Sequence, residues 1–157
     1  MTTPANTAPA AEKPPTATDV ALVRASFDLI VPVADVAADL FYERLFYLAP
    51  SVRRLFPDDT RNQKRKLILM LATCVQGLDD IPALAPQLKA LGARHTAYGA
   101  KDGTYRLAGD VLMWTLERVL SADFTPAVQR AWRRVYAFIA ATMKEGAAEA
   151  AVTSAAA

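Results

Sequence analysis

The chain has 157 residues, of which 53% are hydrophobic and 22% are charged, and its formal net charge is +2. This length and apolar content suit one domain with a single buried core, and the mild charge argues against a nucleic-acid partner. No apolar run approaches the roughly 20 residues that span a bilayer, and the N-terminus lacks a secretory signal, so we expect a cytoplasmic protein without a membrane partner. The lone cysteine, Cys74, is typical of a reducing compartment.

Helical periodicity alternates with proline and glycine breaks along the chain, and no stretch alternates with a period of two, so the sequence predicts an all-α fold. Residues 1–16 are rich in Pro, Ala and Thr, and we expect them to form a disordered tail before a domain over residues 17–147. A first helix is predicted over about residues 18–31 and ends at Pro32, and a second helix ends at Pro50.

A short link follows, and then a long helix is predicted from about residue 59, with acidic residues at its start and Gly77 at its end. Pro82 opens the next helix, which carries His95 and is interrupted by Gly99.

The last two predicted helices run from about residue 102, with Asp102 or Thr104 as the cap, and from Thr125. Residues 148–157 are expected to form a disordered C-terminal tail, with a fraying helix end as the alternative. Six long helices and a short link predict helix-on-helix packing rather than a simple four-helix bundle.

His95 is the only histidine in the chain and the first candidate for chemistry. The backbone carbonyl of Leu91, one turn earlier, can hold one ring nitrogen while the other points across the core, which suits an axial metal ligand. No cluster of Cys, His or carboxylates has metal-binding spacing, and a single imidazole suffices where a macrocycle supplies the other ligands. These residues favour haem, and a purely structural histidine is the alternative.

Five segments in the same order carry a resemblance to a known family: LFYERLF, APSVRRLF, NQKRKL, LGARHTAYGAKDGTY and AWRRVYAFIA. From about residue 19 to residue 143 the chain resembles the globins, particularly the bacterial single-domain haemoglobins and the globin domain of flavohaemoglobins. The resemblance implies a globin fold around haem b and reversible, high-affinity binding of dioxygen, with CO and NO as further ligands. It also implies an enzymatic role, nitric oxide dioxygenation with an external flavin reductase, beside oxygen storage, transport or sensing.

On the distal side, the resemblance places Tyr42 and Gln63 as the two polar residues that act on bound dioxygen and would carry any catalysis. Phe56 matches the phenylalanine that packs against the haem, and Leu67 matches the apolar residue above the iron. Gln63 and Leu67 are four residues apart, so they share one helix face. A phenol and an amide can both donate hydrogen bonds to a polarised ligand, whereas an ordinary core tyrosine is the alternative for Tyr42.

On the proximal side, the resemblance places His95 as the iron ligand, Leu91 beside it in the cofactor-binding wall, and Tyr105 near the histidine. Lys66 and Arg94 are the candidates for contacts with the haem propionates. The basic run that contains Lys66 is otherwise an ordinary solvated helix face.

The sequence departs from flavohaemoglobins in the last helix, where the position of their proximal glutamate is Ala147. Glu145 lies two residues away and therefore points elsewhere on a helix. No glycine-rich motif for flavin or nicotinamide follows, so redox turnover needs an external reductase. We expect a monomer or homodimer, and the competing function is a haem-free globin-fold interaction or signalling module.

Overall fold

The structure, a computed structural model, describes residues 12–156, and the elements within them are all helical. Their bounds are α1 Ala17–Ile30, the 3₁₀ turn η1 Val31–Val33, α2 Ala34–Leu48, α3 Pro50–Arg53, α4 Arg61–Gly77, α5 Ile81–Ala97, α6 Asp102–Leu120, the 3₁₀ turn η2 Ser121–Asp123 and α7 Pro126–Ala155. The predicted all-α fold is confirmed over this part of the chain. Most of the tail predicted over residues 1–16 lies outside the described residues.

Local hydrogen bonds explain where several helices begin. Thr16 Oγ1 accepts from the backbone N–H of Asp19 at 3.1 Å, and the Asp19 carboxylate accepts from the N–H of Thr16 at 3.0 Å, which forms a capping box at α1. Asp80 and Thr125 cap α5 and α7 with their side chains, and a proline stands in the first turn of both helices. At α6 the N-cap is Lys101, so neither Asp102 nor Thr104 is the cap, although Thr104 Oγ1 in the first turn accepts from the N–H of Lys101 at 3.2 Å.

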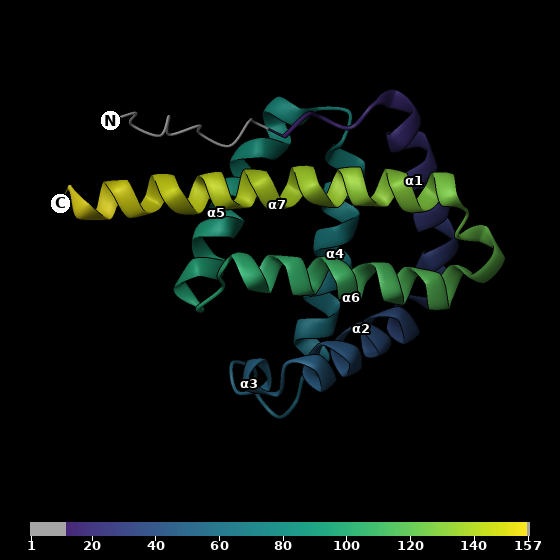
Figure 1. Cartoon of the computed structure of the whole chain (residues 1–157), viewed down its shortest axis with the longest axis horizontal. Helices are drawn as coiled ribbons and strands as arrows, with labels where there is room; N and C mark the ends of the chain where they lie inside the picture. Colours follow the sequence, from purple (N-terminus) through teal and green to yellow (C-terminus); the bar gives the residue numbers. More distant parts are fainter. Residues whose placement is uncertain (1–11, 157) are drawn as a thin grey trace, which may run out of the picture.

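The helices cross one another around one core (Figure 1). α6 and α7 run antiparallel and are joined by η2, α5 packs mainly on α7, and α2 packs on α6 and α4. Trp132 on α7 is 2% exposed, and its indole N–H donates to Ser26 Oγ on α1 at 2.8 Å. A buried indole with a hydrogen-bond partner joins α1 to α7 without a desolvation penalty.

The C-terminal helix is longer than the sequence predicted. Residues 148–157 were expected to form a disordered tail, whereas α7 continues through Ala155. Alanine and glutamate are strong helix formers, and Lys89 Nζ on α5 lies 2.9 Å from a carboxylate oxygen of Glu149. The prediction of a C-terminal tail is therefore wrong up to Ala155. No helix among the described residues combines the length and the apolar character needed to cross a membrane.

Candidate functional site

The His95 side chain lies in the last turn of α5 and is half-buried. Its Nδ1 is 2.9 Å from the backbone carbonyl oxygen of Leu91, which is the contact that the sequence predicted. A carbonyl only accepts hydrogen bonds, so this contact favours the tautomer in which Nδ1 carries the proton. The lone pair of Nε2 is then available, as a metal ligand requires.

A turn closed by backbone hydrogen bonds follows His95. The His95 carbonyl accepts from the N–H groups of Tyr98 at 3.1 Å and Ala100 at 3.0 Å. Gly99 between them has φ +95°, a left-handed conformation that favours glycine because it has no Cβ. This turn ends α5 and lets α6 begin at Asp102.

Tyr105 is buried near the start of α6, and its hydroxyl has no hydrogen-bond partner among the described residues. Its backbone carbonyl accepts from the Tyr136 hydroxyl at 2.5 Å, and Lys144 Nζ lies 5.3 Å from its ring centroid. Burial, with the charge of Asp102, raises the pKa of Tyr105, so the phenol stays neutral. Buried donors are nearly always hydrogen-bonded, so this hydroxyl is free to donate to a group outside the described residues.

Three aromatic rings lie around the candidate distal residue Tyr42, which is 5% exposed on α2. Its ring centroid lies 5.3 Å from that of Phe41, 5.7 Å from that of Phe46 and 5.7 Å from that of Phe56. Aromatic rings at these separations stabilise one another beyond their buried area. Phe46 is four residues after Tyr42 on the same helix, a spacing that indicates a shared face.

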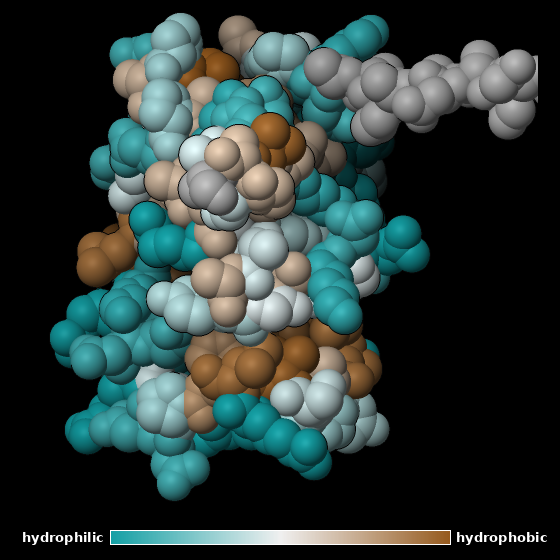
Figure 2. All heavy atoms as spheres, turned by 90° about the vertical axis from the view of Figure 1, so that its left-hand side faces the viewer, coloured by the Kyte–Doolittle hydropathy of each residue, from teal (hydrophilic) through white to brown (hydrophobic). Residues whose placement is uncertain are grey.

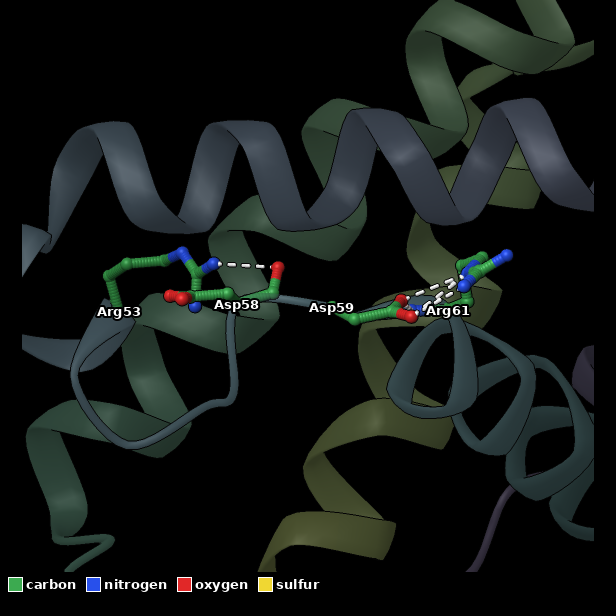
Figure 3. A network of polar contacts seen from close by, with 4 residues as sticks. All are labelled: Arg53, Asp58, Asp59 and Arg61. Carbon is green, nitrogen blue, oxygen red and sulfur yellow. Dashed lines mark hydrogen bonds and ion pairs between the residues drawn. The ribbon is translucent and has the colours of Figure 1, made fainter.

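Arg53 holds the segment that carries Phe56 (Figure 3). Its guanidinium donates to the carbonyl oxygens of Phe56, Pro57 and Asp58 at 3.2, 2.9 and 3.1 Å, and its Cζ lies 5.1 Å from the Phe46 ring centroid. A planar group with five donors can serve several carbonyls at once, so one side chain orders this link.

The start of α4 is organised by two ion pairs. Asp59 accepts from Arg61 (Figure 3), which lowers the pKa of Asp59 to about 2, and α4 begins at Arg61, slightly later than predicted. Lys64 Nζ lies 2.8 Å from Asp39 of α2. Lys66 is exposed and forms no ion pair within residues 12–156. Two members of the basic run are thus engaged, and Lys66 remains accessible.

Gln63 and Leu67 are half-buried on the same face of α4. Burial raises the pKa of Tyr42, while hydrogen bonding by the Gln63 side chain partly opposes that shift. Tyr42 and Gln63 therefore lie close to each other. Leu67 lines an apolar cavity of about 20 Å³ together with residues of α1, α2, α6 and α7. This space is about that of one water-sized molecule.

Two further predictions concern charged residues around His95. Arg94 is exposed and forms no ion pair within the described part of the chain. The carboxylate of Glu145 lies 3.2 Å from Lys89 Nζ, so it is engaged with the first half of α5 rather than with His95. This agrees with the expectation that Glu145 points elsewhere, and Ala147 is half-buried without a polar side chain to offer.

Apolar side chains gather in the lower half of the face shown in Figure 2, with hydrophilic residues around them. Half-buried apolar residues packed against the core include Phe56 after α3, Leu67 on α4 and Leu91 on α5. Small-molecule and cofactor sites are lined mostly by apolar side chains with a few polar groups. These apolar side chains and the imidazole of His95 are the residues present that could hold a largely apolar ligand.

Comparisons with known proteins agree with this reading of the fold. The Globin family profile matches residues 39–143. A neuroglobin from Tetraodon nigroviridis is 27% identical over 142 residues, covering 82% of this chain and 89% of that protein. A crystal structure of a hexacoordinated haem protein from an anhydrobiotic tardigrade, at pH 4, is similar with a TM-score of 0.75 and 21% identity, and the match covers 85% of this chain and 96% of that chain.

The matched segment extends over most of the domain and contains both His95 and Tyr42. The chain belongs to the globin family, as the sequence predicted. Membership of this family supports a haem-binding and gas-binding protein, whereas the similarity to the tardigrade structure, at 21% identity, shows the fold alone.

Proposed function

We propose that this globin holds haem b through Nε2 of His95 and reversibly binds dioxygen and the other diatomic gases CO and NO. The observation that carries the proposal is the state of the His95 ring, which is half-buried with Nδ1 held by the Leu91 carbonyl at 2.9 Å. That contact orients the ring and raises the basicity of the other nitrogen.

The haem supplies the iron that takes the gas, and the surrounding side chains of this chain fit such a group. Phe56, Leu67 and Leu91 offer apolar contacts on both candidate walls. The hydroxyl of Tyr105, which has no partner among the described residues, offers a hydrogen-bond donor. Lys66 and Arg94, both exposed, are accessible to the two propionates, which are well matched to charged donors.

Tyr42 and Gln63 are proposed to set the affinity for dioxygen. The raised pKa of Tyr42 keeps its phenol protonated at neutral pH, so the hydroxyl donates a hydrogen bond to a polar ligand. The surrounding rings of Phe41, Phe46 and Phe56 exclude water, which strengthens such a bond. This arrangement supports high affinity and the bacterial, flavohaemoglobin-like type that the sequence resembles.

Iron coordination is proposed to differ from that of a protein with two axial imidazoles. The tardigrade protein is described as hexacoordinated, but the present chain has His95 as its only histidine. A second imidazole therefore cannot come from the same chain. A sixth ligand from the protein would be a side chain such as Tyr42, Gln63 or Lys66, and otherwise water or hydroxide.

Nitric oxide dioxygenation is the enzymatic activity that we propose for this site. Haem held by His95 would supply the ferrous iron for the conversion of nitric oxide and dioxygen to nitrate, a conversion that oxidises the iron by one electron, and an external flavin reductase would return that electron in each turnover. Tyr42 and Gln63 would polarise the dioxygen in this reaction. We place the protein in the cytoplasm, as a monomer or homodimer, where such a reductase would act.

The test is the visible spectrum of the purified protein and of His95→Ala after haem addition, with exposed Thr96→Ala as the matched control on α5. We expect a Soret band in the wild type and in Thr96→Ala. His95→Ala should stay helical by circular dichroism, retain haem poorly and recover part of its spectrum with imidazole. A wild-type haem spectrum in His95→Ala would refute the ligand assignment, and no Soret band in the wild type would favour the haem-free interaction module.

A further inference from the structure

Helices α5 and α7 approach each other backbone to backbone at two glycines. A Cβ on Gly92 of α5 would overlap the backbone carbonyl of Met143, and a Cβ on Gly146 of α7 would overlap the backbone of Lys89. Lys89 is three positions before Gly92 on α5, and Met143 is three positions before Gly146 on α7, so the two contact residues of each helix lie on one face. The contact is therefore reciprocal, and neither glycine has room for a methyl group.

The other glycines in the chain do not share this property. A Cβ on Gly103 would meet nothing within 4 Å, whereas one on Gly109 would meet the ring of Tyr136 and one on Gly77 the side chain of Leu84. Side chains can rotate away from an added methyl group, but a backbone carbonyl within a helix moves only with the helix. Substitution at Gly92 or Gly146 must therefore displace α5 relative to α7.

Two ion pairs lie on the same crossing. Lys89 Nζ is 3.2 Å from a carboxylate oxygen of Glu145 and 2.9 Å from one of Glu149. Lys89 is also the residue whose backbone a Cβ on Gly146 would overlap. The ion pairs therefore constrain the sideways position of α5 where the two helices are closest.

His95 is three residues after Gly92, about one helical turn, and Leu91, whose carbonyl holds Nδ1 of His95, directly precedes Gly92. A helix is stiff over one turn, so a displacement at Gly92 moves the imidazole and its backbone acceptor together. We propose that Gly92 and Gly146 are positioning residues, which set how far the His95 imidazole reaches toward the iron and thereby the strength of that bond. This inference rests on the proposed role of His95 as the haem ligand.

The experiment compares haem-loaded wild type with Gly92→Ala and Gly146→Ala. We expect both variants to shift the iron–histidine stretching band of the ferrous protein in resonance Raman spectra. Haem loss to an acceptor globin should become roughly 10-fold faster, in the range seen when groups that orient a metal ligand are removed. Neither quantity depends on an enzymatic assay.

Two control variants separate positioning from loss of stability. Gly103→Ala adds a methyl group in open space and should leave the band unchanged. Val23→Ala removes buried volume on α1, where Val23 is 0% exposed, and should lower resistance to urea while the band stays at its wild-type frequency. If Val23→Ala shifts the iron–histidine band as the glycine variants do, the shift reports general packing, and Gly92 and Gly146 are not positioning residues.

A milder variant covers the case in which the glycine variants do not fold. Lys89→Met removes both ion pairs without adding a steric overlap, and it should shift the band by less than Gly92→Ala and accelerate haem loss. If the glycine variants fold and keep the wild-type iron–histidine band, the inference is overturned. If the glycine variants do not fold, a wild-type band and a wild-type rate of haem loss in Lys89→Met overturn it. If the wild type itself shows no iron–histidine band, the proposed function fails instead.

Discussion

The two helices that carry the candidate site are held in different ways. α5, with His95, has buried residues at Leu84, Leu88 and Gly92 and meets α7 through its backbone. α4, with Gln63 and Leu67, is buried only at its far end, at Cys74 and Val75. The position of His95 therefore depends on backbone packing between α5 and α7, whereas the positions of Gln63 and Leu67 on α4 depend on side-chain packing. Substitutions on α4 can therefore change ligand binding with little effect on the fold.

The largest expected effect comes from truncating one leucine on each helix. Leu88 is 1% exposed, so Leu88→Ala should lower the free energy of unfolding by about 3 kcal/mol through lost burial and the cavity left behind. Leu67 is half-buried, and Leu67→Ala should cost about half as much. Urea denaturation of the haem-loaded variants measures both, and equal losses would contradict the difference between the helices.

The next largest effect is expected for dioxygen release after substitution of Tyr42, on the distal side of the candidate site. Tyr42→Phe removes a donor to a polar ligand in a buried setting, a loss of about 1.5–3 kcal/mol. Dioxygen should dissociate roughly 10- to 150-fold faster, while the binding of carbon monoxide, a less polar ligand, should change little. Stopped-flow dissociation gives both rates, with Tyr47→Phe, 75% exposed on the same helix, as the matched control. Unchanged dioxygen release in Tyr42→Phe would show that the phenol only packs.

A third prediction concerns the pH dependence of stability that Cys74 contributes at the buried end of α4. Burial raises the pKa of Cys74 from its ordinary value of 9.0 to about 11. The neutral thiol is favoured in the folded state, so its contribution to stability is complete below pH 9 and is lost as pH rises toward and through 11. Between pH 8 and pH 11 the loss amounts to about 2 kcal/mol.

Tyrosines with raised pKa values also titrate at high pH, so the measurement compares two proteins rather than one curve. The stability of the wild type relative to Cys74→Ala should fall by that amount across this pH range in urea denaturation. If the difference in free energy of unfolding between the two proteins stays constant with pH, the Cys74 thiol has the same pKa in the folded and the unfolded state, and the prediction is wrong.

The smallest effect is expected for the second polar residue of the distal wall. Gln63 is half-buried, so water can replace part of what its amide contributes. Gln63→Leu should therefore speed dioxygen release in the same direction as Tyr42→Phe but by less than about tenfold. Exposed Asn62→Leu is the control on the same helix. An effect of Gln63→Leu larger than that of Tyr42→Phe would reverse the proposed order of the two donors.

Much of the architecture could be predicted from local signals. Thr125 with Pro126 starts α7, Gly99 ends α5, and the contact between His95 and Leu91 lies within one helix, so all of these depend on neighbours in the sequence. The extension of α7 could not be predicted in this way. An alanine-rich segment is compatible with a helix or a tail, and its partner Lys89 is 60 residues from Glu149.

The sequence by itself determined the helical class, the globin family and the presence of a single imidazole, because periodicity, motif order and composition are properties of the chain alone. The tertiary structure decided which side chains meet. It placed Gln63 beside Tyr42 and brought Gly92 onto the backbone of Met143. These contacts join residues of different helices or require a particular crossing of two helices, and the geometry of such a crossing depends on the packing of the whole core.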